Sequence, residues 1–168
     1  MDYSKAVSYW EEKDKSSLQM QSEALRSEIE KFIALHNTCA LATGFGEFVR
    51  CTPIEYSYYK SKFWLFSEGG LKFQGLKENK NICLSIYNPY TGFGNLGGMQ
   101  VTGKATLVEP WSEEYLCLLS YRKISVENLK KSPHPLYLIC ITPTRIDFLW
   151  SEFAAMGYNI RQHLLCDI

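Results

Sequence analysis

The sequence predicts a mainly β protein, an antiparallel barrel with peripheral helices. Aromatic residues make up 14% of the 168 residues, including 11 Tyr and 9 Phe, and aromatic side chains favour strands. Short apolar or alternating runs also follow one another, separated by Gly, Asn and Pro, while helical periodicity is confined to the ends and the crossovers. Sequentially adjacent strands of this kind are typical of a closed or nearly closed antiparallel sheet.

The N-terminal region, residues 1–36, is expected to hold a charged leader up to about Lys15 and then one helix. Ser16 or Ser17 is the expected N-cap, because a serine hydroxyl can accept from the first free backbone N–H groups. The apolar residues behind it approximate a single helical stripe. They are Leu25, Ile29, Phe32, Ile33 and Leu35.

The barrel is expected within residues 38–150, in one domain that spans 1–168. The predicted strands cover residues 39–43, 49–59, 61–67, 82–87, 99–108, 137–141 and 145–150. Short helices are expected over 71–78 and 110–122, and a glycine-rich loop over 88–98. The last segment, 151–168, is expected to be a terminal helix.

Composition excludes several classes of function. Lys+Arg and Asp+Glu are both 18, so the chain lacks the basic excess of a nucleic-acid coat protein. No apolar run approaches the ~20 residues that span a bilayer. The six cysteines form no CxxC pair and are interpreted as buried, reduced thiols. We therefore expect a cytoplasmic protein with no nucleic-acid or membrane partner and no metal site.

Residues 50–79 hold the strongest candidate site. They read Arg50-Cys-Thr-Pro-Ile-Glu, then a strand ending in Leu65-Phe-Ser67, then Glu-Gly-Gly-Leu-Lys72. This order resembles the flavin-binding core of the pyridoxamine 5′-phosphate oxidase family, where Arg-x-Val-Leu-Leu-Lys precedes Phe-x-Tyr-Thr-Asn-x-x-Ser-Arg-Lys-x-x-x-Leu-x-x-Asn. The matching positions are Arg50, Lys72, Leu76 and Asn79, followed by Gln100-Val101, Gly103 and Arg145-Ile-Asp-Phe148.

The resemblance implies a Greek-key split barrel of six or seven strands that binds FMN at the interface of a homodimer. Physical chemistry favours the same residues, because the FMN phosphate is a dianion that needs fixed cations and donors. Lys72 lies near a helix start, where backbone N–H groups also attract anions. The expected cofactor-binding residues are Arg50, Cys51, Thr52, Pro53, Ile54, Phe66, Ser67, Lys72 and Gln100.

The resemblance also implies an oxidoreductase that acts on a small molecule, with unassigned catalytic residues. Two alternatives stay open: a non-catalytic or stress-related flavin-binding module, and a haem-binding barrel that uses one of the three histidines. Gly70-Leu71 replace the family's Ser-Arg, which removes two phosphate ligands. Arg161 and His163 copy part of the family's Arg-x-His-x-Arg segment, but Leu165 replaces its last arginine. We expect inefficient oxidation of pyridoxamine 5′-phosphate, and a polar helix face at Arg161 and His163.

Overall fold

The computed structural model describes residues 2–133 and 136–166. Its strands are β1 Thr38–Phe45, β2 Phe48–Glu55, β3 Ser57–Tyr59, β4 Lys62–Ser67, β5 Asn81–Tyr87, β6 Gly97–Val108, β7 Tyr137–Trp150 and β8 Arg161–Leu165. Its helices are α1 Tyr3–Lys15, α2 Ser22–Ala34, α3 Lys72–Glu78, α4 Glu113–Tyr121, α5 Val126–Lys130 and α6 Glu152–Ala155.

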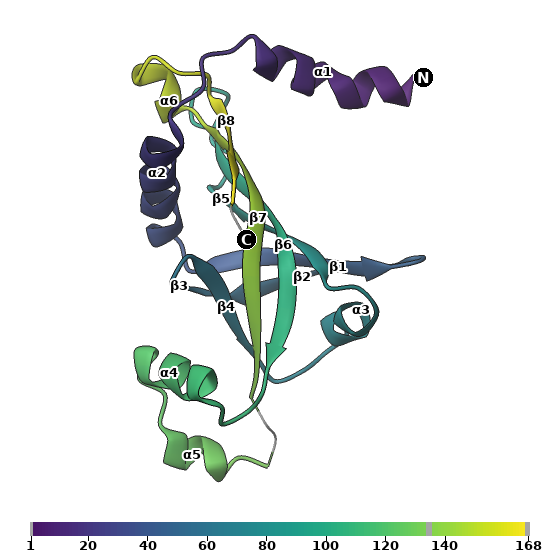
Figure 1. Cartoon of the computed structure of the whole chain (residues 1–168), viewed down its shortest axis with the longest axis vertical. Coiled ribbons are helices and arrows are strands. Elements are labelled where there is room, and N and C mark those ends of the chain that lie inside the picture. The colour runs from purple at the N-terminus through teal and green to yellow at the C-terminus, as the bar shows by residue number, and fades with distance from the viewer. Residues whose placement is uncertain (1, 134–135, 167–168) are drawn as a thin grey trace.

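The strands form one antiparallel sheet in the order β2-β1-β5-β6-β7-β4-β3, with β8 also paired to β7. In Figure 1 the long strands β6 and β7 run the length of the molecule, and β1 and β2 cross them. Helices α4 and α5 lie at one end, and α1 projects from the other. The mainly β split-barrel prediction is confirmed, with eight strands in place of six or seven.

Along one edge, strand β7 pairs with two different strands in succession, β4 and then β8. Its first half, Tyr137–Ile141, pairs with β4, and its second half, Arg145–Leu149, pairs with β8. The sequence analysis predicts two strands here, over residues 137–141 and 145–150, and Pro143 between them cannot donate to a ladder. The structure has one strand, because β6 changes register between Thr102 and Gly103, opposite Pro143. The bulge accommodates the proline without ending the strand.

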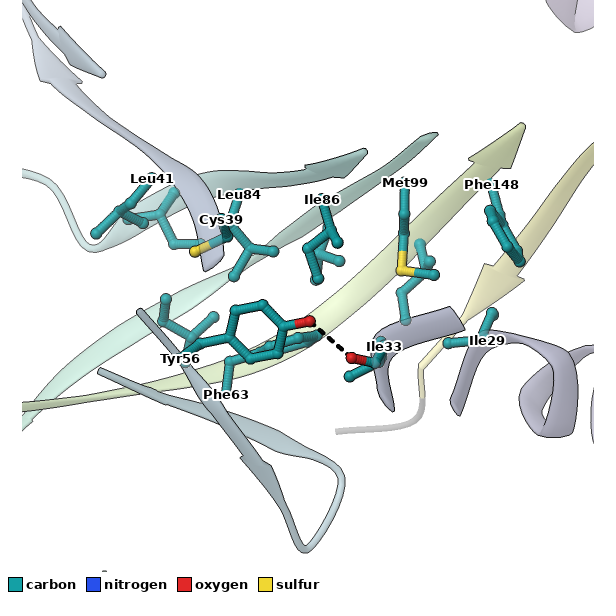
Figure 2. Close-up of a cluster of buried hydrophobic side chains, with 14 of the residues drawn as sticks. Ile29, Ile33, Cys39, Leu41, Tyr56, Phe63, Leu84, Ile86, Met99 and Phe148 are labelled. Carbon is teal, nitrogen blue, oxygen red and sulfur yellow. Dashed lines mark hydrogen bonds between the residues drawn. The ribbon is translucent and has the colours of Figure 1, made fainter. Parts of the chain in front are cut away.

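The main core lies between the sheet and α2. Leu25, Ile29, Phe32 and Ile33 of α2 are buried against strand residues such as Phe148. Figure 2 shows Ile29 and Ile33 facing this cluster, with the Tyr56 hydroxyl directed at the Ile33 carbonyl oxygen, 2.8 Å away. Leu35 does not join the stripe and is 74% exposed. A second cluster forms beneath α4 around Trp64, Tyr115 and Leu138.

The expected N-terminal leader is wrong, because residues 3–15 form helix α1. Asp2 caps it, with its carboxylate accepting from the Ser4 and Lys5 amides. Ser16 and Ser17 do not begin the next helix; their hydroxyls donate to carbonyl oxygens of the last turn of α1. Helix α2 begins after Gln21, which makes no side-chain capping bond.

The expected C-terminal helix is also wrong. Within residues 151–166, the described part of this segment, only α6 is helical, and residues 161–165 form β8 against the second half of β7. Gln162 and Leu164 point inward and are buried, which is strand alternation. The Gln162 side chain also ties the link between α1 and α2 to β8: its oxygen accepts from the Met20 amide at 2.7 Å, and its nitrogen donates to the Leu18 carbonyl at 3.4 Å. The same nitrogen donates to the Asn159 carbonyl, just before β8, at 2.6 Å.

The cysteine interpretation needs correction as well. Cys51 and Cys117 are exposed, on the outer side of β2 and on α4, whereas Cys39 and Cys140 are buried. Burial raises the pKa of the Cys39 thiol to about 12, with a further contribution from Cys51.

Candidate functional site

The structure brings Arg50 and Lys72 together, although 22 positions separate them in the sequence. Lys72 is 6% exposed. Burial lowers the pKa of its ammonium group, and the nearby Arg50 guanidinium lowers that pKa further. In the part of the chain that the structure describes, no carboxylate forms an ion pair with either residue. Two cations without a counter-ion, one of them buried, form an electrostatic site for an anion.

Helix α3 carries Lys72 and is held closely on β1. A Cβ atom at Gly75 would lie 3.0 Å from Thr43 Cβ and 3.2 Å from the Gly44 nitrogen, so only glycine fits without displacement. At the end of α3, the Asn79 amide donates to the Gly44 carbonyl at 2.9 Å. Because Thr43 is also the partner of Arg50 across the β1–β2 ladder, these contacts set the position of Lys72 relative to Arg50.

The loop between β4 and α3 connects Ser67 with Lys72. The Ser67 hydroxyl donates to the Gly69 carbonyl at 3.1 Å, and the Lys72 ammonium group donates to the same oxygen. Gly69 and Gly70 have φ values of 133° and 104°, which favour glycine. The Phe73 and Gln74 amides already donate within this turn, to Gly70 and Leu71. The expected contribution of free helix N–H groups is therefore smaller, and the side chains carry more of the site.

The segment Cys51–Ile54 lies in β2, the last strand on its side of the sheet. Thr52 and Ile54 face inward opposite Leu41 and Cys39, whereas Cys51 and Pro53 are exposed. An edge strand offers unpaired backbone groups, as the resemblance implies for the flavin ring edge. The Phe66 side chain points elsewhere: it packs against Tyr115 of α4, with ring centroids 6.0 Å apart.

Gln100 does not join the Arg50–Lys72 pair. It lies on the outer face of the sheet, in a row of cross-strand partners that runs Pro53, Ala40, Ser85, Gln100, Asp147, His163. Arg50, in contrast, is the cross-strand partner of buried Thr43 and lies on the inner face. Its strand, β2, is also three strand spacings from β6, the strand of Gln100, so the two strands are about 14 Å apart. Within one chain, Gln100 and Lys72 cannot contact the same phosphate.

A polar cavity of about 220 Å³ lies at the far end of this row, lined by Gln100, Asp147, Arg161 and His163 among others. Sequence reasoning missed this grouping. The sequence analysis predicts a polar helix face at Arg161 and His163, and it includes Asp147 only as part of the strand Arg145-Ile-Asp-Phe148. The sequence offers little signal for this strand, because one of its two inward residues, Gln162, is polar.

No metal site appears among the described residues, where no group of three or more His, Cys, Asp or Glu side chains is arranged to hold an ion. Both ring nitrogens of His36 already contact oxygen atoms, at 2.8 Å from the Phe32 carbonyl and 2.8 Å from the Asn88 amide oxygen. His134, another histidine considered for haem, lies outside the described residues.

A family model described as pyridoxamine 5′-phosphate oxidase matches residues 25–150. The chain belongs to this family. The match includes the Arg50–Lys72 pair and Gln100, and it ends before β8. Among curated proteins, none matches the chain.

Solved structures support the family's fold for this chain. A Listeria innocua protein assigned as a pyridoxamine 5′-phosphate oxidase has 21% identity and a TM-score of 0.59, covering 74% of this chain and 98% of its own. A FAD-binding protein of Mesorhizobium loti has 16% identity and a TM-score of 0.53, covering 70% and 87%. The haem storage protein HutZ of Vibrio cholerae has 16% identity and a TM-score of 0.57, covering 74% and 91%. These identities establish the fold alone.

Within the described ranges, no helix combines the length and the apolar character needed to cross a membrane.

Proposed function

We propose that this protein binds FMN and acts as a flavin-dependent oxidoreductase on a small molecule. One observation carries the proposal: the Arg50 and Lys72 cations lie near each other, on the edge strand β2 and on α3, and neither has a carboxylate partner among the described residues. A phosphate dianion would neutralise both charges and accept hydrogen bonds from them, and charge-assisted bonds of this kind are about twice as strong as neutral ones.

The neighbouring strand supports a flavin rather than a free phosphate. Beside the cation pair, the edge strand β2 presents backbone donors and acceptors over Cys51–Ile54, which suit the polar edge of a flat ring. Ser67, directed at Gly69, would turn its hydroxyl to the phosphate. FMN would supply the electron transfer, and the protein would supply binding and orientation.

The proposal includes a homodimer. Gln100 and the cation pair lie on opposite faces of one sheet, so a site that uses both needs a second copy of the chain. The row of outer-face residues that contains Gln100 also contains the small residues Ala40 and Ser85. Such a face suits close approach of another sheet or of a flat ring.

We expect light scattering at micromolar concentration, with FMN bound, to report twice the chain mass of 19.4 kDa. A mass of one chain under these conditions would contradict a site shared between copies, and it would leave Gln100 without a role in cofactor binding.

Lys72→Ala should weaken FMN binding by about 1.5–3 kcal/mol, or roughly 10- to 150-fold in Kd, the range for a hydrogen bond to a charged group. Quenching of flavin fluorescence during titration measures it. Lys77→Ala is the matched control, because Lys77 lies on the same helix with its side chain 82% exposed. Equal Kd values for both variants would remove Lys72 from the phosphate site.

The absorption spectrum of the purified protein identifies the bound cofactor. A flavin band near 450 nm, from general flavin chemistry, supports the proposal, whereas a haem band would favour the function named for HutZ. Anaerobic reduction by NADPH then separates an oxidoreductase from a flavin-binding module without turnover. The expectation of inefficient pyridoxamine 5′-phosphate oxidation stays a prediction.

A further inference from the structure

His163 lies between two carboxylates that come from opposite ends of the chain. Its Nε2 atom is 2.7 Å from Asp14 Oδ2 on α1, and its Nδ1 atom is 2.7 Å from Asp147 Oδ1 on β7. The His163 side chain is 21% exposed and the Asp14 side chain 12%. The contact with Asp14 therefore joins the N-terminal helix to the last strand, across 149 positions.

Both contacts are attractive only when the imidazole is protonated. A neutral imidazole has one N–H group, so one nitrogen would present its lone pair to a carboxylate, whereas the imidazolium donates from both nitrogens. The hydrogen bond to Asp147 raises the pKa of His163; burial opposes this effect, and the contact with Asp14 adds to it. Burial alone would raise the pKa of Asp147. The hydrogen bonds from His163 and Arg145 outweigh burial and lower the pKa of Asp147 to about 2.

Helix α1 has few other attachments to the body. None of its residues is buried. Besides the His163 bond, the Trp10 ring lies 4.2 Å from the Arg161 guanidinium carbon. Arg161 Nε is 3.9 Å from Asp14 Oδ1, and neither atom has a hydrogen-bond partner within residues 2–133 and 136–166. The link that follows is held separately, because the Gln162 side chain bonds to the Met20 amide and to the Leu18 carbonyl. Helix α1 can therefore leave β8 while the link stays in place.

We propose that α1 is a pH-sensitive strap, docked on β8 by the imidazolium of His163 between Asp14 and Asp147 and released when that imidazolium loses its proton. This inference does not depend on flavin binding. Asp14 is the contact that is lost, because Asp147 lies within the sheet and is also bound by Arg145, at 2.6 Å from Nη2. A 13-residue helix without tertiary contacts is marginal in water, so the released strap frays.

The charged and titratable groups around His163 come from four elements. Helix α1 contributes Asp14 and Glu11, whose charge acts on Arg145; β7 contributes Arg145 and Asp147; β8 contributes Arg161; and β5 contributes Cys83, which faces Asp147. Arg145 Nη2 lies 3.3 Å from Nδ1 and opposes protonation, but both carboxylates are closer.

The direction of the pH dependence follows from the raised pKa of His163. Docking is fully stabilised below the pKa of the released histidine and is lost as the pH rises through the pKa of the docked one. Between these two values, the docking equilibrium constant should fall about tenfold per pH unit. Release frees His163 Nε2 and the Arg161 guanidinium from α1, and both residues line the cavity beside Gln100.

The test uses ¹³C-labelled full-length protein and nuclear magnetic resonance. The His163 ring signals, identified by their loss in His163→Gln, report protonation. The methyl groups of Ala6 and Val7 report the motion of α1, and they do not exchange with water at alkaline pH. We expect methyl order parameters on α1 to fall with the same midpoint as the His163 titration. In Asp14→Asn, α1 should already be mobile at pH 6, and the pKa of His163 should fall.

Two comparisons separate the strap from general destabilisation. Asp14→Asn removes an acid from the last turn of α1, where the helix dipole disfavours it, so mobility in this variant cannot be assigned to a weaker helix. Glu12→Gln removes another acid from the same helix at an exposed position and should behave as the unaltered protein. Rigid α1 methyl groups throughout the His163 titration would overturn the proposal. A pH-dependent release that persists in His163→Gln would overturn it too.

Discussion

Replacing Gln162 with leucine should lower the free energy of unfolding by about 2–6 kcal/mol. The side chain is 0% exposed, and leucine cannot replace its bonds to the Met20 amide and the Asn159 carbonyl. Each buried backbone group left without a partner costs about 1–3 kcal/mol. The Leu18 carbonyl is spared, because the Asn159 amide also donates to it. Urea denaturation followed by circular dichroism measures the change.

Gln21→Leu is the control, because Gln21 is exposed at the start of α2 and makes no side-chain capping bond. It introduces the same change of residue type nearby, and we expect an unfolding free energy within about 0.5 kcal/mol of the original. Similar losses in both variants would mean that Gln162 is not the anchor of the link.

Gly75→Val should weaken FMN binding without altering any residue proposed to touch FMN. The new side chain would meet Thr43 and the Gly44 backbone, where a Cβ atom alone is already at 3.0–3.2 Å. Helix α3 must then move off β1 and carry Lys72 away from Arg50. Overpacking of this kind costs about 1–3 kcal/mol of stability. We expect a loss of affinity comparable with that of Lys72→Ala, measured by the same flavin titration.

Gln74→Val, at the adjacent exposed position of α3, isolates the intrinsic effect of valine on the helix. Valine is a better helix former than glycine, so any loss specific to Gly75→Val comes from the contact with β1. Unchanged FMN affinity in Gly75→Val would show that the position of α3 does not control the site.

The strands that pack on α2 were predictable because one face of each is buried. In β5, for example, the apolar residues Ile82, Leu84 and Ile86 occupy every second position, and all three are buried. The same reasoning failed at β8, where the pattern is only five residues long and a glutamine occupies an inward position. Gln162 is inside because it satisfies backbone groups of a segment more than 140 positions away, and local periodicity carries no such information.

The candidate site was predictable in part. Family spacing groups Arg50 and Lys72 as phosphate ligands; in the structure α3 packs on β1 through Gly75, which brings Lys72 near Arg50, and their binding of a phosphate stays a prediction. The same spacing groups Gln100 with them, but in the sheet Gln100 lies three strand spacings from Arg50 and on the opposite face. The Asp14–His163 contact could not be predicted, since it depends on α1, where the sequence analysis predicts a charged leader, and on β8, where it predicts a terminal helix.

The anchoring of residues 17–20 to β8 also sets an order of events during synthesis. Gln19 and Met20 emerge from the ribosome early, yet their partners are Arg161 and Gln162, 142 positions later. The link therefore cannot dock until the last strand has been made, and α1 cannot dock before it. Because contacts at such sequence separation close slowly, we expect the barrel to form first, with the N-terminal helix as the final segment to join the native structure.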